Sequence, residues 1–204
     1  MDNIRQKFSN KFRNHWIEVK FYKKEPKLKY ARKLKDVKFC EATKEAILGP
    51  VLLDKESINC KGAQYVFGWQ VERKDKNYLI DTCQVKRQAE KDILLSMLSH
   101  IPRFKEPFKY IGLNTEGKPD LIMSYLMPKD VMNLLKIYNN NRNKNLDVSL
   151  PSMMPICGGI AVETYRKKKM SLSFGCDDSR KYAHIGKARL AVGIPKNLFK
   201  VFVG

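Results

Sequence analysis

Four of the five cysteines fall into two pairs of nearly equal spacing. Cys60 follows Cys40 by 20 residues, and Cys176 follows Cys157 by 19. Four thiolates brought to one point form a sulfur site of the kind that Zn²⁺ and [4Fe–4S] clusters take. The chain lacks both the C-x-x-C knuckles of most zinc sites and the compact ferredoxin motif. Spacing alone therefore leaves three alternatives open, which are a cluster, zinc, and free cysteines buried in the core.

The segments that carry the cysteines repeat weakly. The first cysteine of each pair begins a short match between 39–42 and 156–159, and the second opens the related segments 60–68 and 176–186, each with a Tyr followed by a Gly. This repeat predicts a single domain, 1–204, with possible pseudo-repeated lobes at about 14–110 and 119–200. A pseudo-twofold axis between two such lobes would bring all four cysteines to a shared interface. We therefore expect the cofactor-binding or metal-binding residues to be Cys40, Cys60, Cys157 and Cys176.

Other reactive residues offer weaker alternatives. Cys83 lies outside the two pairs and is either structural or a spare ligand, and His184 is a further possible ligand or proton donor. Cys176 is also a possible nucleophile if a helix N-terminus and Arg180 lower its pKa, but it has no identifiable His–Asn or His–Asp partner. The acidic pair 177–178 would hold Mg²⁺ or serve as a cap or a surface ion pair. Catalytic residues are thus left unassigned.

Charge gives a second functional hypothesis. The 204 residues carry 40 Lys and Arg against 21 Asp and Glu, a net charge of +19, and residues 1–40 alone hold 13 basic and 4 acidic residues. Clustered Lys and Arg bind nucleic-acid phosphates through counterion release. A nucleic-acid partner is the alternative to a redox partner protein, and a lysine-rich proteome would also explain the excess charge.

Composition and hydropathy bound the protein class. The chain is 43% hydrophobic and has 11 Gly and 9 Pro, so it can bury a core. There is no run of 18 apolar residues and no signal-peptide pattern at the first residue positions, which predicts a cytoplasmic protein without a membrane span. Five cysteines in a reducing compartment are not expected to form a disulfide framework. The sequence does not predict an oligomeric state.

The elements that must position these residues mix strands and helices without a regular βαβ rhythm, which predicts an α+β fold with mixed or antiparallel sheets. Strands are expected at 15–22, 65–71, 78–80, 121–126, 170–174 and 189–194, and helices at 40–47, 84–99 and from Pro128 onward. The first strand should bury Ile17, Val19 and Phe21 and expose Glu18 and Lys20. Three of the paired cysteines, Cys40, Cys157 and Cys176, lie just before an expected helix or in a glycine-rich turn, where backbone N–H groups favour a thiolate.

The chain also resembles domain-of-unknown-function family 169, a family of proteins of archaea and anaerobic bacteria. The resemblance spans most of the chain and is carried by Val19–Tyr22, Phe39–Ala42, Cys60–Ala63 with Gly68, Cys157–Gly159, Phe174–Arg180 and Val192–Pro195. It implies no particular activity. It does imply an anaerobic setting, which favours an iron–sulfur cluster over zinc, with a role in electron transfer, redox sensing or cluster delivery.

Overall fold

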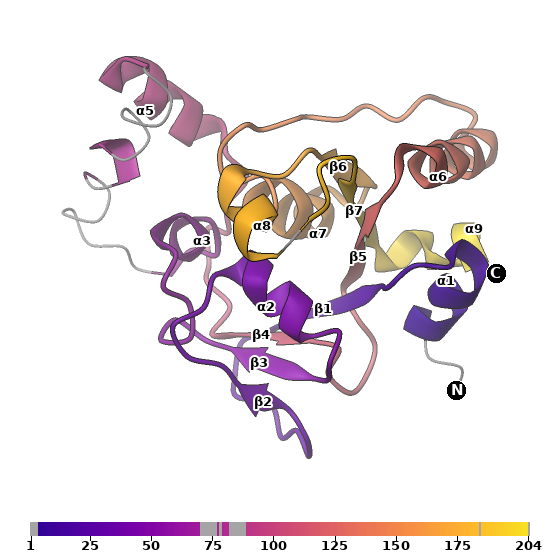
Figure 1. Ribbon diagram of the computed structural model, residues 1–204, viewed down its shortest axis with the longest axis horizontal. Helices are drawn as coiled ribbons and strands as arrows, with labels where there is room; N and C mark the ends of the chain where they lie inside the picture. The colour runs from indigo at the N-terminus through magenta and orange to yellow at the C-terminus, as the bar shows by residue number, and fades with distance from the viewer. Residues whose placement is uncertain (1–3, 70–76, 78, 82–88, 184, 204) are drawn as a thin grey trace.

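A seven-stranded sheet forms the centre of the protein in the computed structural model (Figure 1), which describes residues 4–69, 77, 79–81, 89–183 and 185–203. The strand order is β2-β3-β4-β1-β5-β7-β6. All neighbouring strands pair antiparallel except β2 and β3, which are parallel. The strands are β1 (Ile17–Tyr22), β2 (Arg32–Lys33), β3 (Val51–Leu53), β4 (Tyr110–Leu113), β5 (Leu121–Leu126), β6 (Ser171–Ser173) and β7 (Leu190–Pro195).

Helices cover both faces of this sheet. Those on the face that carries the paired cysteines are α2 (Phe39–Glu45), α3 (Lys61–Val66), α5 (Lys91–His100), the π-helix η1 (Cys157–Val162), α7 (Glu163–Lys167) and α8 (Asp177–Tyr182). The opposite face of the C-terminal strands is covered by α1 (Ile4–Phe12), α6 (Pro128–Arg142) and α9 (Phe199–Val203), preceded by the 3₁₀ turn η2 (Lys196–Leu198). The described residues thus form an α+β fold, as the sequence predicts.

Alternation along the strands divides the core into two clusters. On β1, Ile17 and Val19 enter the larger cluster, which also contains Cys40 and Cys157. On β5, Ile122 points to the other face and enters the smaller cluster with Phe8, Trp16 and the helices α6 and α9. Two cores on opposite faces are the expected result of a period-2 strand covered by helices on both sides.

The strand β1 has a more buried polar face than its sequence pattern predicts. Glu18 and Lys20 are 5% and 4% exposed, because the turn after β4 lies over them. The Lys20 ammonium donates hydrogen bonds to the carbonyls of Thr115 and Glu116 in that turn, and Asn114 accepts one from the Glu18 amide. The prediction that Glu18 and Lys20 are exposed is therefore wrong. A turn distant in the sequence supplies the hydrogen-bond partners that offset the cost of burying these polar groups.

Several predicted elements are confirmed, among them the strands at 17–22, 121–126, 171–173 and 190–195 and the helix that begins at Pro128. The predicted strand at 65–71 is wrong over its described part, because Tyr65 and Val66 end α3 and a turn follows. The predicted strand at 78–80 is also wrong, since Leu79 and Ile80 are helical. The predicted helix over 84–99 is described only from 89 onward, where α5 starts at Lys91.

No helix among the described residues is both long and apolar enough to cross a membrane.

Candidate functional site

The four paired cysteines line one cavity of about 620 Å³ on the helical face of the sheet. They come from four different elements, α2, the loop before α3, η1 and the loop before α8. Other residues around the cavity include Lys38, Asn59, Met153, Met154, Asp178 and Tyr182. The two cysteine pairs, which lie 97 residues apart in the chain from Cys60 to Cys157, thus meet at one site.

Cys60 and Cys176 occupy equivalent positions, each as the N-cap residue of a six-residue helix. The Cys176 sulfur accepts the backbone N–H of Ser179 at 3.4 Å. At Cys60 the side chain makes no such capping hydrogen bond, but the backbone N–H groups of Ala63 and Gly62 lower the pKa of the thiol, against the larger effect of burial. Both residues are half-buried. Both sulfurs therefore lie at a helix N-terminus, where the first backbone N–H groups have no partner within the helix.

Cys40 and Cys157 also occupy similar positions, in the first turns of α2 and η1. Each is only 8% exposed. The backbone N–H groups of Glu41 and Gly158 lower the pKa of Cys40 and Cys157, against the larger effect of burial. The Cys157 thiol donates to the Met154 carbonyl at 3.7 Å. The site thus has a buried pair and a half-buried pair of thiols, one of each from either half of the chain.

Backbone pairing fixes the first pair of cysteines relative to each other. The Val37 N–H donates to the Ser57 carbonyl at 3.0 Å, and the Asn59 N–H donates to the Val37 carbonyl at 3.0 Å. This short parallel bridge lies just before Cys40 and Cys60. The two segments are therefore aligned before either cysteine is reached.

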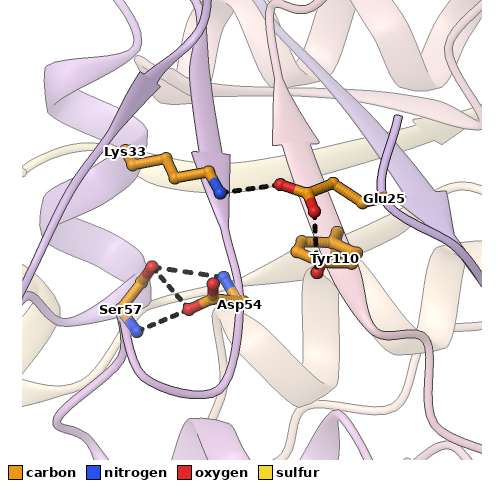
Figure 2. A network of polar contacts seen from close by, with 5 residues as sticks. All are labelled: Glu25, Lys33, Asp54, Ser57 and Tyr110. Atoms are coloured by element: carbon orange, nitrogen blue, oxygen red, sulfur yellow. Dashed lines mark hydrogen bonds and ion pairs between the residues drawn. The ribbon is translucent and has the colours of Figure 1, made fainter. Parts of the chain in front are cut away.

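The turn that leads to Cys60 has its own internal hydrogen bonds. The Asp54 carboxylate accepts from the backbone N–H and the hydroxyl of Ser57, each at 2.9 Å (Figure 2). The Ser57 carbonyl is the one that receives the Val37 N–H. An Asx-type turn of this kind sets the direction of the chain as it enters the cavity wall.

Two glycines allow the helices that carry cysteines to approach closely. A Cβ atom at Gly62 would lie 3.1 Å from Cγ of Met154, and one at Gly158 would lie 3.4 Å from Val66 Cγ1 and 3.3 Å from the Pro102 carbonyl oxygen. The helix α3 packs on η1 at this point, and α2 packs on α8 across the cavity. Larger residues at these two positions would push Cys60 and Cys157 apart.

Burial raises the pKa of three of the thiols, those of Cys40, Cys60 and Cys157. Desolvation, with added repulsion from Cys176 and Cys60, raises the pKa of Cys40 to about 12. Desolvation and the neighbouring cysteines also raise the pKa of Cys157 well above its usual value. Burial raises the pKa of Cys60 as well, but the Ala63 N–H and the Lys38 ammonium oppose that shift. Several thiolates close together require a positive partner, and a metal centre is the usual one.

A buried hydroxyl pair lies next to the first cysteine. The Tyr125 and Thr43 hydroxyls are 2.9 Å apart, and Thr43 donates to the Cys40 carbonyl at 2.6 Å. Burial raises the pKa of Tyr125, opposed by its hydrogen bond to Thr43. The phenol therefore stays neutral and ties strand β5 to helix α2 beside the cavity.

Within the described part of the chain, no group of three or more Cys, His, Asp or Glu residues is arranged to hold a single metal ion. The four thiols line the cavity, but the described residues do not form a ligand set closed around one ion. The site therefore differs from the closed tetrahedral geometry of a structural zinc centre.

The structure places the weaker candidates away from the predicted chemistry or outside the described residues. The Arg180 guanidinium donates to the carbonyls of Phe174, Gly186 and Lys187, and the activation of Cys176 by this residue stays a prediction. Asp178 lies 4.0 Å from the Lys38 ammonium and forms an ion pair, in line with the simpler of its two interpretations. Cys83 and His184 lie outside the described residues.

Two residues at the site were not predicted from the sequence. Lys38 lines the cavity, and Tyr125 bonds to Thr43, whose hydroxyl donates to the Cys40 carbonyl. A lysine in a chain with 40 basic residues gives no signal of its own. Tyr125 occupies an ordinary strand position, so only the fold shows that it meets a helix that carries a cysteine.

Comparison with known proteins shows the family of the chain. The chain matches the family DUF169, described as uncharacterised ArCR, over residues 10–204. The chain belongs to the DUF169 family. No curated protein and no solved structure has detectable similarity to it. The functional conclusion therefore depends on the site and not on a characterised relative.

Proposed function

We propose that this DUF169 protein binds a [4Fe–4S] cluster through Cys40, Cys60, Cys157 and Cys176, for electron transfer, redox sensing or delivery of the cluster to an enzyme. The observation that carries the proposal is the lining of one cavity by four cysteines from two distant segments of the chain. Four cysteine thiolates are the usual ligand set of such a cluster.

The donor set and the surroundings of the sulfurs support the proposal. A backbone N–H donates to the Cys176 sulfur, and backbone N–H groups lower the pKa of Cys40, Cys60 and Cys157. Hydrogen bonds to cysteine sulfur and low solvent exposure are among the factors that set the reduction potential of a cluster. When bound, the cluster would supply one-electron redox chemistry, and the chain would hold it, shield it from water and donate hydrogen bonds to its ligands.

Zinc is the alternative cofactor, and the size of the cavity favours the cluster. A zinc ion requires four sulfurs at about 2.3 Å from one point. The sulfur ligands of a cube-shaped cluster lie further apart, because each binds a different iron atom. A cavity of about 620 Å³ lined by separated thiols fits the larger group better.

The test is a set of single Cys→Ser variants purified without oxygen, with iron measured per chain. Cys40→Ser, Cys157→Ser and Cys176→Ser should each lose most of the iron, and so should Cys60→Ser. Cys83→Ser is the matched control, because it makes the same chemical change outside the four positions, and it should keep the wild-type iron content. Iron that survives in all four ligand variants, or that disappears only in Cys83→Ser, would show that the ligands are assigned wrongly.

Nucleic-acid binding is the second candidate function, favoured by the exposed lysines of the segment 23–35. Lys23, Lys24, Lys27, Lys29, Lys33 and Lys35 are all exposed there, beside Tyr30, which is 78% exposed. An ion pair of 2.7 Å between Lys33 and Glu25 holds part of this segment (Figure 2). Aromatic and basic side chains together are typical of single-strand binding surfaces.

The charge hypothesis has a separate test. Fluorescence anisotropy with a labelled single-stranded RNA should show binding that weakens steeply as salt rises, because each released counterion contributes to the salt slope. Replacement of Lys27, Lys29 and Lys35 by Gln should reduce that slope. Absence of RNA binding at low salt would eliminate this candidate and leave the cluster proposal unaffected.

A further inference from the structure

The side chain of Lys38 turns into the wall of the four-cysteine cavity instead of outward into water. Lys38 is the extended residue just before α2, with φ −84° and ψ 151°. Its backbone N–H donates to the Glu41 carboxylate at 3.3 Å, and the bridge at Val37 fixes the preceding residue. The backbone therefore sets the direction in which this lysine leaves the chain.

Two residues of α8 hold the Lys38 ammonium on the other side of the cavity. The Nζ atom lies 4.7 Å from the centroid of the Tyr182 ring and 4.0 Å from Oδ2 of Asp178. The Lys38 side chain is 22% exposed, whereas Lys35, three residues earlier in the chain, is exposed to solvent. A cation over an aromatic face and beside a carboxylate is a positioned charge, not a freely moving surface lysine.

The charges of Lys38 and Asp178 both act on the cysteines. Burial raises the pKa of Cys60, and among the smaller contributions the Lys38 ammonium lowers it while the Asp178 carboxylate raises it. Asp178 also adds to the raised pKa of Cys40, where burial is again the main cause. Lys38 and Asp178 line the same cavity as the four cysteines, so their opposite charges act on the group that the sulfurs would hold.

We propose that Lys38 is a positioning residue of the cofactor site, whose ammonium offsets the negative charge of the bound cluster and raises its reduction potential. The inference rests on the proposed cluster. Reduction adds one electron to the cluster, so the charge of a [4Fe–4S] unit with four thiolates goes from −2 to −3, and no proton or bond is exchanged. A fixed positive charge stabilises the −3 state more than the −2 state, so it makes reduction easier.

The opposite role of Asp178 follows from the same geometry. Its carboxylate disfavours the more negative, reduced state, and it also neutralises part of the Lys38 charge at 4.0 Å. Loss of this carboxylate should therefore shift the potential in the direction opposite to the loss of Lys38. A lysine that served only to fasten α2 to α8 would not produce this pair of opposite shifts.

The experiment is a redox titration, with dithionite as the electron donor, of protein reconstituted with iron and sulfide without oxygen. Lys38→Met should shift the midpoint potential to a more negative value. Lys38→Arg keeps the positive charge, so its potential should stay close to the wild-type value. Asp178→Asn should shift the potential to a more positive value. Lys35→Met is the matched control, because it removes the same charge from an exposed position, and it should leave the potential at the wild-type value.

The outcomes separate this inference from the proposed function. A wild-type protein that takes up no iron overturns the cluster itself. A loaded Lys38→Met protein with the wild-type potential, or with the same shift as Lys35→Met, overturns the role of Lys38 and leaves the cluster intact. If Lys38→Met fails to hold iron, Asp178→Asn decides the question, and an unchanged potential in that variant overturns the inference.

Discussion

The four cysteines differ in exposure in the same way within each pair. Cys40 and Cys157 are both 8% exposed, and Cys60 and Cys176 are half-buried at helix N-caps. One cysteine of each kind comes from each half of the chain. A cluster held by this set would have a buried side toward the core and a more accessible side toward α3 and α8, which is where an electron or the cluster itself would leave.

This asymmetry predicts an order of thiol modification in the metal-free protein. Cys176 and Cys60 should react with iodoacetamide before Cys40 and Cys157, because access of the reagent falls with burial. Peptide mass spectrometry at increasing reaction times measures the order. Equal rates at all four positions would show that the cavity is open or collapsed when no metal is bound, and protection of all four after loading is expected.

At the scale of single residues, the sequence predicted which cysteines come together but not how they are held. Equal spacing within the pairs was enough to match Cys40 with Cys157 and Cys60 with Cys176. The contacts of Lys38 and Tyr125 with the site arise from packing between α2, α8 and β5, and no local pattern contains them. The sequence also does not show that three backbone carbonyls accept hydrogen bonds from the Arg180 guanidinium.

At the scale of elements, the cap of α8 is the part most directly tied to a cysteine. The Ser179 hydroxyl accepts the Cys176 backbone N–H at 2.8 Å and donates to the Cys176 carbonyl at 2.7 Å, and Ser179 is fully buried. Gly175, with φ +80°, lets the chain turn into this cap, and a Cβ there would lie 2.7 Å from the Ser179 hydroxyl. The position of Cys176 thus depends on two small residues.

Ser179→Ala should lower the free energy of unfolding of the metal-free protein by about 1–2 kcal/mol, since it removes the partner of a helix N-terminal N–H in a buried position. Urea denaturation followed by circular dichroism measures the change. Ser99→Ala is the control, because the Ser99 hydroxyl bonds only at the exposed end of α5 and its loss should cost little. An equal effect of the two substitutions would show that the cap does not stabilise α8.

Element prediction from the sequence succeeded where periodicity was long and failed where it was short. The six-residue strand β5 and the 15-residue helix α6 are long enough for their patterns of apolar residues to be recognised in the sequence. The stretch from Tyr65 onward is rich in aromatic and β-branched residues, which favour strands. Here Cys60 caps a helix whose small residues Gly62 and Ala63 pack closely on η1, so tertiary contacts override local propensity.

At the scale of the whole molecule, one sheet joins the two halves of the chain. The strands β2, β3, β4 and β1 all precede residue 114 in the chain and adjoin the later strands β5, β7 and β6 through the β1–β5 pairing. The cysteine-bearing helices lie on one face of this sheet, on both sides of that junction (Figure 1). The sequence predicted the α+β class, but the strand order depends on long-range pairing that it does not encode locally.

A site that joins helices from both halves should stabilise the whole fold when it is loaded. We expect the cluster-loaded protein to unfold at a higher temperature than the metal-free protein, because a ligand that binds only the folded state adds its binding free energy to stability. Differential scanning fluorimetry without oxygen, before and after removal of iron by a chelator, measures this shift. The Cys157→Ser variant should show no shift on treatment with iron and sulfide.

The most direct test of the central claim is the iron and acid-labile sulfide content of the protein purified without oxygen, with its visible absorption spectrum. The account predicts about four irons and about four sulfides per chain, with broad absorption that disappears on exposure to a chelator and oxidant. Zinc without sulfide, or a protein with neither iron nor sulfide after anaerobic reconstitution, would contradict it.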